Sequence, residues 1–170
     1  MTNHANIGIL AGYRPGLIGR VTEMHASYYA ANAGFGQHFE AVVARGLASF
    51  CDRLNHPRNS IWVATRDDHI VGSIAIDGED LGEGLAHLRW FILDDAFRGK
   101  GLGKALLATA LRFVDDLEFR ETHLWTFKGL EAARHLYDRA GFSCIEEYAG
   151  YQWGQLVLEQ RLARPHPSPA

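Results

Sequence analysis

The chain has 170 residues, of which 47% are hydrophobic and 22% charged, a composition ordinary for one globular domain with a sizeable core. The formal net charge of −3 gives no electrostatic footprint for nucleic acid, so we expect no nucleic-acid partner. No apolar run approaches the ~18 residues of a transmembrane helix, so we expect no membrane partner either.

The ends of the chain and its cysteines give further expectations. The start, Met1–Asn6, is polar and lacks the apolar segment of a secretory signal, so we expect a cytoplasmic protein. Cys51 and Cys144 lie far apart in apolar surroundings, which favours buried thiols over a disulfide or a metal site, and we expect no metal. Residues 164–170 include three prolines and little to bury, which predicts a disordered tail after a single domain over residues 1–163.

Hydrophobic periodicity predicts the order of the elements. Short apolar or alternating runs predict strands over residues 7–10, 61–65, 70–76, 86–93, 122–127, 142–148 and 155–162. Helical spacing of apolar residues predicts helices over 17–28, 39–54 and 102–117, and another around Tyr137 that ends at Gly141. Pro15 would occupy the first turn of the first of these helices. The predicted hairpins come early in the chain, and the strand–helix–strand units come later. This order predicts a mixed α+β fold, with a mostly antiparallel sheet of six to seven strands and helices on both faces.

The segment from Arg98 to Lys104 joins the strand over 86–93 to the helix that begins near Leu102. Three glycines alternate through it: Gly99, Gly101 and Gly103. They remove the Cβ atoms that would hold a ligand away from the backbone. The N–H groups and dipole of the helix start attract anions, and Arg98 and Lys100 add positive charge. This pattern predicts a diphosphate-binding site.

Two common nucleotide motifs do not fit this segment. A P-loop requires Ser or Thr after its Gly-Lys, and Ala105 stands there instead. A dinucleotide fingerprint, G-x-G-x-x-G, requires its third glycine one residue later than Gly103.

The pattern that fits is R-x-x-G-x-G at Arg98, Gly101 and Gly103, which resembles the acyl-CoA pyrophosphate loop of the GNAT superfamily of N-acetyltransferases. Residues 132–142 resemble the A-x-x-L-Y-x-x-x-G-F segment of the same family. The resemblance covers about residues 5–162 and is similar to the GNAT half of fusions with a winged-helix regulator, here without a DNA-binding half. It implies the GNAT fold, in which strands 4 and 5 splay apart and acyl-CoA enters the gap.

The resemblance implies acetyl-CoA as co-substrate and assigns its contacts. The strand segment whose backbone pairs with the pantetheine arm corresponds to Phe91–Leu93, and an N–H near Phe91 or Ile92 would stabilise the oxyanion. Gly129 and Leu130 stand where many relatives carry an asparagine that contacts the pantetheine, so this contact is in doubt. The residues assigned to acetyl-CoA are Phe91, Ile92, Leu93, Arg98, Gly99, Lys100, Gly101, Leu102, Gly103, Lys104 and Ala133.

Acetyl transfer to an amine requires a base for the amine, a donor for the oxyanion and a proton for the departing thiolate. Tyr137 matches the tyrosine that lies near the CoA sulfur in many members, or it is an ordinary core tyrosine. His87 stands where several members carry a glutamate and could act as the base, directly or through one water, or be a histidine without a role. Carboxylates of the preceding loop are the alternative bases: Glu79, Asp80 and Glu83.

The first two helices would roof the acceptor pocket. The aromatic residues in this region are Tyr28, Tyr29, His25, Phe35 and Phe39, with Trp125 on the strand beside the gap. Most would be core residues, and one or two would line the pocket.

Two functions stay open. The first is an N-acetyltransferase that moves an acetyl group from acetyl-CoA to a primary amine by direct attack in a ternary complex, the acceptor being a small molecule or a protein amino group. The alternative is a non-catalytic acyl-CoA-binding sensor or regulatory module. Relatives are often dimers, so a homodimer is one expected state.

Overall fold

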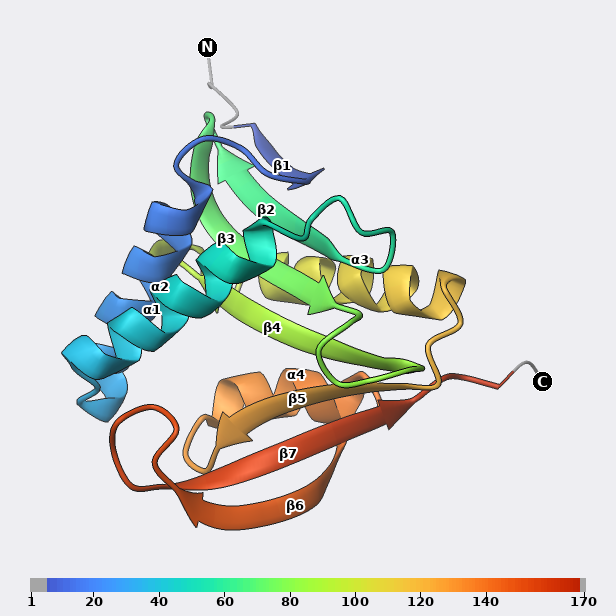
Figure 1. The fold of residues 1–170 in the computed structure, drawn as a ribbon. Helices are drawn as coiled ribbons and strands as arrows, with labels where there is room; N and C mark the ends of the chain where they lie inside the picture. Colours follow the sequence, from blue (N-terminus) through green and yellow to red (C-terminus); the bar gives the residue numbers. More distant parts are fainter. Residues whose placement is uncertain (1–5, 169–170) are drawn as a thin grey trace.

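The structure, a computed structural model, describes residues 6–168, which form a seven-stranded sheet and four α-helices (Figure 1). Residues 1–5 and 169–170 lie outside the described residues. The strands are β1 (Ile7–Ala11), β2 (Ser60–Arg66), β3 (His69–Asp77), β4 (Leu85–Leu93), β5 (Glu121–Phe127), β6 (Ser143–Gly150) and β7 (Val157–Pro165). The helices are α1 (Leu17–Ala33), α2 (Gln37–Cys51), α3 (Leu102–Asp116) and α4 (Glu131–Arg139), with a 3-10 turn at Asp95–Phe97.

The strand order is β1-β2-β3-β4-β5-β7-β6, and β4 and β5 run parallel while the other neighbours of this sheet run antiparallel. β4 and β5 pair over only three residues each, from Leu85 opposite Glu121 to His87 opposite His123. Beyond that point the two strands diverge (Figure 1). The predicted mixed sheet with splayed fourth and fifth strands is confirmed.

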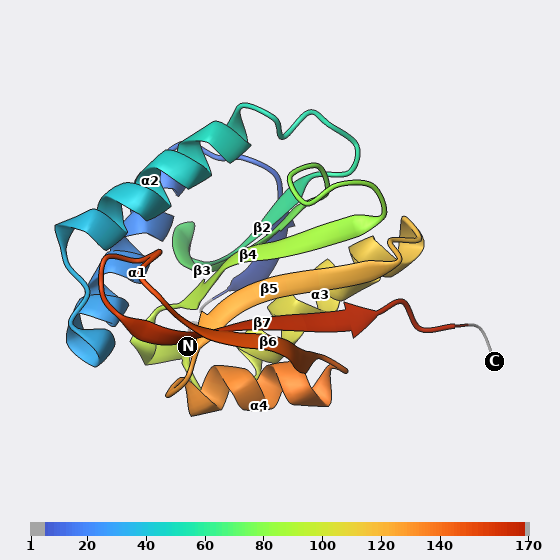
Figure 2. The same cartoon turned by 60° about the horizontal axis from the view of Figure 1, so that its bottom comes forward.

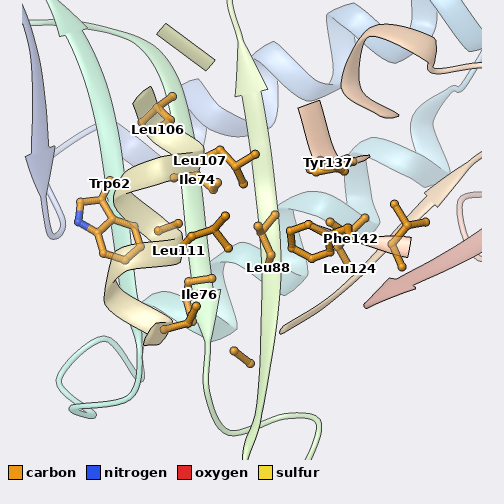
Figure 3. Packing of buried hydrophobic residues seen from close by; sticks show 14 of the residues in the cluster. Trp62, Ile74, Ile76, Leu88, Leu106, Leu107, Leu111, Leu124, Tyr137 and Phe142 are labelled. Carbon is orange, nitrogen blue, oxygen red and sulfur yellow. The ribbon is translucent and has the colours of Figure 1, made fainter. Parts of the chain in front are cut away.

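The helices cover the two faces of the sheet in pairs, with α1 and α2 on one face and α3 and α4 on the other (Figure 2). The core under α3 continues past β4, so that one cluster spans both halves of the divided sheet (Figure 3). The cluster residues that Figure 3 labels on β4 and on the segments beyond it are Leu88, Leu124, Phe142 and Tyr137. Buried apolar contact therefore joins the two halves where backbone pairing does not.

Two boundaries differ from the predicted ones. α1 begins at Leu17, after Gly16 with φ 90°, so Pro15 precedes the helix instead of occupying its first turn. At the other end, β7 extends through Pro165, so the strand includes the first two residues of the predicted disordered tail. The Arg164 guanidinium donates two hydrogen bonds to the Asp115 carboxylate, at 2.8 and 2.9 Å, and this bidentate pair fixes the end of the strand to α3.

His25 of α1 is 6% exposed and lies in the layer between helix and sheet. Its Nδ1 lies 2.8 Å from the Val21 carbonyl oxygen, so the neutral ring donates Nδ1–H to that oxygen. Burial disfavours the imidazolium and lowers the pKa of His25 to about 4, although the Val21 bond works in the opposite direction.

Folding stability should therefore depend on pH through His25. Between pH 6.5 and about 4 the unfolded chain binds a proton at His25 that the folded chain does not, so stability falls on acidification. A shift of this size corresponds to about 3 kcal/mol over the window. Urea unfolding across this range should show a weaker pH dependence in His25→Phe, while His69→Phe, at an exposed position, keeps the full dependence. Equal pH dependence in all three proteins would contradict this assignment.

Candidate active site

A cavity of about 960 Å³ occupies the opening between β4 and β5. Its walls come from α1 and α2 on one side and from α4 with the turn before it on the other. The glycine segment lies at one end, and residues 87–89 of β4 with Trp125 of β5 lie at the other. The volume is typical of a site for a small ligand or cofactor.

The glycine segment turns sharply before α3. Gly99 and Gly101 have φ of 74° and 81°, in the left-handed region that glycine adopts without strain, and a Cβ at either would meet open space. Gly103 is different, because a Cβ there would lie 3.1 Å from Leu93 Cδ1 in the contact between helix and strand. α3 begins at Leu102, so its first N–H groups are free of intrahelical partners.

The edge of β4 that faces β5 is unpaired after His87. The Asp94 N–H donates to Val71 O of β3 at 2.8 Å. Because successive N–H groups of a strand alternate in direction, the N–H of Leu93 points away from β3 and into the opening. This geometry leaves backbone groups of β4 available to a ligand with amide groups.

A bulge interrupts β4 at Trp90, whose φ is 47°, unusual for a bulky residue. The Trp90 carbonyl accepts a hydrogen bond of 2.7 Å from Ser73 Oγ of β3. In a trans peptide the following N–H points the opposite way, so the N–H of Phe91 faces the opening. Between Phe91 and Ile92, the N–H that faces the opening is therefore that of Phe91.

Arg98 is held within the protein instead of extending freely to a ligand. Its guanidinium donates to Asp95 at 2.9 Å and to the Leu93 carbonyl at 3.0 Å, and it lies 4.1 Å from the centre of the Tyr28 ring. Arg98 thus ties the glycine segment to β4 and α1 while lining the cavity.

Tyr137 of α4 is 7% exposed and lines the cavity. Its ring packs edge-to-face on Phe91 and Phe142, with centroid distances of 6.1 and 5.7 Å. Burial, with a smaller contribution from Tyr29, raises the pKa of Tyr137 above its ordinary value. The phenol therefore keeps its proton at neutral pH and can donate it.

His87 forms a close pair with a carboxylate of the loop between β3 and β4. Its Nδ1 lies 2.7 Å from Asp80 Oδ2, and its ring meets Trp125 edge-to-face at 4.9 Å. Burial lowers the pKa of His87, and the hydrogen bond to Asp80 offsets part of this effect. His87 is therefore a neutral imidazole at pH 7, oriented by a carboxylate and placed at the cavity wall.

Two other carboxylates, Asp77 at the end of β3 and Glu79 of the loop, are engaged elsewhere. Asp77 is buried and accepts two hydrogen bonds from Arg53. Glu79 accepts from Arg53 at 2.7 Å and from Asn59 at 2.6 Å, and these bonds lower the pKa of Glu79. A carboxylate stabilised in this way is a poor base, and neither residue lines the cavity. Glu83 is exposed and also lies outside the lining.

The loop between β6 and β7 closes one side of the opening. Its Trp153 packs on Phe35 and Phe127, with ring centroids 6.3 and 5.5 Å away, and Gln155 donates to the Gly34 carbonyl at 2.6 Å. The loop thus joins the C-terminal half of the sheet to the turn between α1 and α2.

The predicted site residues fall into two groups. Of those assigned to acetyl-CoA, Phe91, Ile92, Leu93, Arg98, Gly99, Gly101, Gly103, Lys104 and Ala133 line the cavity, as do Tyr137 and His87. Lys100 and Leu102 do not, and they face a smaller hollow beside Ile7 and Phe97. Of the aromatic residues under the roof, Tyr28, Tyr29, His25 and Phe39 line the cavity, while Phe35 is core.

Sequence reasoning missed two features of this cavity. Arg89 lines it two residues after His87, and this spacing places both side chains on one face of a strand. Leu130 also lines it, although it departs from the family pattern.

Neither cysteine belongs to this cavity. Cys51 and Cys144 are half-buried free thiols outside its lining, and burial raises the pKa of Cys51. Over residues 6–168 no group of three His, Cys, Asp or Glu side chains is placed to hold a metal ion. Within the same range no helix is long and apolar enough to cross a membrane.

The model of the Acetyltransferase (GNAT) family matches residues 21–142. The chain belongs to the GNAT family. N-acetyltransferase 8B of Homo sapiens is 31% identical to this GNAT protein over 107 residues, which cover 61% of the chain and 47% of the relative. N-acetylaspartate synthetase of Xenopus tropicalis is 32% identical over 92 residues, which cover 54% and 34%. The chain thus spans half or less of the length of these relatives.

Solved structures agree with this fold. YncA of Salmonella typhimurium, solved with its cofactor acetyl-CoA, superposes with a TM-score of 0.75 at 13% identity, covering 98% of this chain and 97% of that one. At this identity the comparison shows the fold. The resemblance inferred from the sequence is confirmed.

The close contact at Gly103 gives a test of how the glycine segment is held. In Gly103→Val the branched side chain would intrude between α3 and Leu93, which should lower the free energy of unfolding by about 1–3 kcal/mol. Ala105→Val, an exposed position on the same helix, carries the same β-branched side chain and should lose less than about 1 kcal/mol. Urea denaturation measures both. Similar losses in the two variants would mean that the contact is unimportant.

Proposed function

We propose that this GNAT protein is an acetyl-CoA-dependent N-acetyltransferase that transfers the acetyl group to a primary amine by direct attack in a ternary complex. The observation that carries the proposal is one cavity with the open edge of β4, the start of α3 and Tyr137 on one side and His87 on the other. The two relatives named above are an N-acetyltransferase and an N-acetylaspartate synthetase, and YncA was solved with acetyl-CoA.

The residues present fit acetyl-CoA. The free N–H groups at the start of α3, with Lys104 beside them, suit its diphosphate, and the left-handed turns at Gly99 and Gly101 give close access to the backbone. The unpaired edge of β4 suits the amides of the pantetheine arm. Bound acetyl-CoA supplies an acetyl group activated as a thioester.

The chain then supplies an oxyanion donor, a general base and a proton donor. The N–H of Phe91 donates a hydrogen bond to the acetyl oxygen, where negative charge develops. His87, oriented by Asp80, accepts the proton of the amine, directly or through one water. Tyr137 donates its proton to the departing sulfur. One C–N bond forms and one C–S bond breaks, so no covalent acyl-enzyme is needed and neither cysteine takes part.

The deciding experiment combines binding with turnover. Acetyl-CoA and CoA should raise the melting temperature, because each binds the folded state. Thiol release should then depend on an added amine, tested over a panel of amino acids, polyamines, aminoglycosides and peptides. A shift without release from any amine would support a CoA-binding module instead. No shift would reject both functions.

Tyr137→Phe should lower kcat by about a hundredfold or more, because the buried phenol is the proton donor for the thiolate. CoA affinity in the thermal-shift titration should change little, since the ring and its packing remain. Tyr13→Phe, at a position that is 58% exposed and outside the cavity, is the control and should retain full turnover. Unchanged turnover in Tyr137→Phe would remove this residue from the mechanism.

The pH profile of kcat tests His87. Because burial lowers its pKa, the acid limb should lie below the ordinary histidine value of about 6.5, and His87→Ala should lose that limb along with most of the rate. Asp80 raises this pKa, so Asp80→Asn should move the limb to lower pH. Glu83→Gln removes an exposed carboxylate of the same loop and should leave the limb in place. A His87→Ala profile identical to that of the unaltered protein would exclude His87 as the base.

A further inference from the structure

The acceptor end of the cavity contains a guanidinium that the proposed chemistry does not use. Arg89 of β4 lines the cavity, and its side chain is 29% exposed. The guanidinium lies 4.1 Å from the centre of the Trp90 ring and packs close to Gly46 of α2, where a Cβ would lie 3.4 Å from Nη2. Packing from two sides therefore fixes the position of this charge.

The charge of Arg89 has a single ion-pair partner, Asp80, which it shares with His87. The guanidinium makes no hydrogen bond within residues 6–168, and its nearest carboxylate oxygen, Asp80 Oδ2, lies 3.6 Å away. That oxygen is already 2.7 Å from His87 Nδ1. Asp77 and Glu79, the other carboxylates in this region, both bind Arg53.

Burying a cation is unfavourable when nearby anions compensate its lost hydration only weakly. Burial accordingly lowers the pKa of Arg89. The planar guanidinium matches a carboxylate with two parallel hydrogen bonds, and such charge-assisted bonds are strong. An anionic group bound from the cavity would therefore complete a site whose protein side is already positioned.

The position of Arg89 relative to the proposed base sets the kind of anion. His87 Nδ1 and Arg89 Nη1 both approach Asp80 Oδ2, at 2.7 and 3.6 Å, so these nitrogens can be no further apart than the two distances combined. Nε2 of His87, the ring nitrogen left free to accept the amine proton, lies across the same imidazole ring from Nδ1. A ligand that meets both groups must carry its amine and its negative charge within a few bonds of each other. Trp125, across the opening from His87, offers an apolar surface for the rest of such a ligand.

We propose that the acceptor is a small amino acid, with its carboxylate on the Arg89 guanidinium and its amine directed to His87. This inference rests on the proposed acetyl transfer and adds the substrate class. It makes Arg89 the residue that selects amines carrying a carboxylate over polyamines, aminoglycosides and protein lysines.

The first test uses the unaltered protein and matched pairs of acceptors. Each of the common amino acids is compared with its decarboxylated amine in the thiol-release assay with acetyl-CoA. For the preferred amino acid, kcat/KM should exceed that of its decarboxylated partner by about tenfold or more, the equivalent of one charge-assisted hydrogen bond. Decarboxylated amines that react as fast as the amino acids, or faster, would overturn the proposal.

The second test removes the guanidinium. Arg89→Met should raise KM for the preferred amino acid by about 10- to 100-fold and leave its decarboxylated partner little changed. Arg89→Lys should recover part of the loss, because it restores the charge without the planar fork. Arg112→Met, at an exposed position on α3 outside the cavity, has the same change in net charge and should behave like the unaltered protein. Equal losses for both members of the pair in Arg89→Met would contradict carboxylate binding.

A binding measurement separates this proposal from the proposed function. Calorimetric titration of the same amino acids into the protein saturated with CoA requires no turnover. Binding that Arg89→Met abolishes, with no acetylation of any amine, would uphold carboxylate binding by Arg89 and reject the transferase. Acetylation of amines without binding of any amino acid would reject the carboxylate site and uphold the transferase.

Discussion

Backbone pairing between β4 and β5 stops after three residues, and the rest of the molecule is arranged around the strand edge that this leaves open. An unpaired edge inside a protein normally costs stability, because its N–H and C=O groups lose their partners. Here the buried cluster from Leu88 to Leu124 joins the two halves on one face, and the loop carrying Trp153 joins them on the other. The sheet can therefore stay divided without the domain separating.

The two ends of the opening differ in chemistry because different kinds of groups reach them. At the α3 end the backbone itself supplies the donors, and side chains such as Arg98 mainly hold the loop in place. At the other end side chains dominate, and two groups, His87 and Arg89, converge on Asp80 Oδ2. Arg53 forms ion pairs with Asp77 and Glu79. Its positive charge therefore keeps the acidic residues here from making this end of the cavity uniformly negative.

Sequence periodicity and the glycine pattern were enough to predict the order of the elements and the start of α3, because both depend on local chain geometry. The bulge could not be predicted, since nothing in the sequence around Trp90 signals a left-handed residue. The positive charge of Lys100 predicts a place at the diphosphate site, but between the left-handed turns at Gly99 and Gly101 it lies beside another hollow. His87 pairs with Asp80 because the chain between them folds back and brings residues seven positions apart together. Sequence spacing alone does not reveal this path of the chain.

The bulge at Trp90 also divides β4 into two stretches, and side chains at odd-numbered positions lie on opposite faces of the sheet in the two. Before it, His87 and Arg89 share the α2 face, and after it Phe91 packs toward Tyr137 on the other face. Side chains alternate along a strand, so one residue more or less here would exchange the faces of everything that follows. Substitutions at this point alter single contacts, whereas a one-residue insertion or deletion would turn the lining of the cavity into core and the core into lining. The length of β4 is therefore under stricter constraint than its composition.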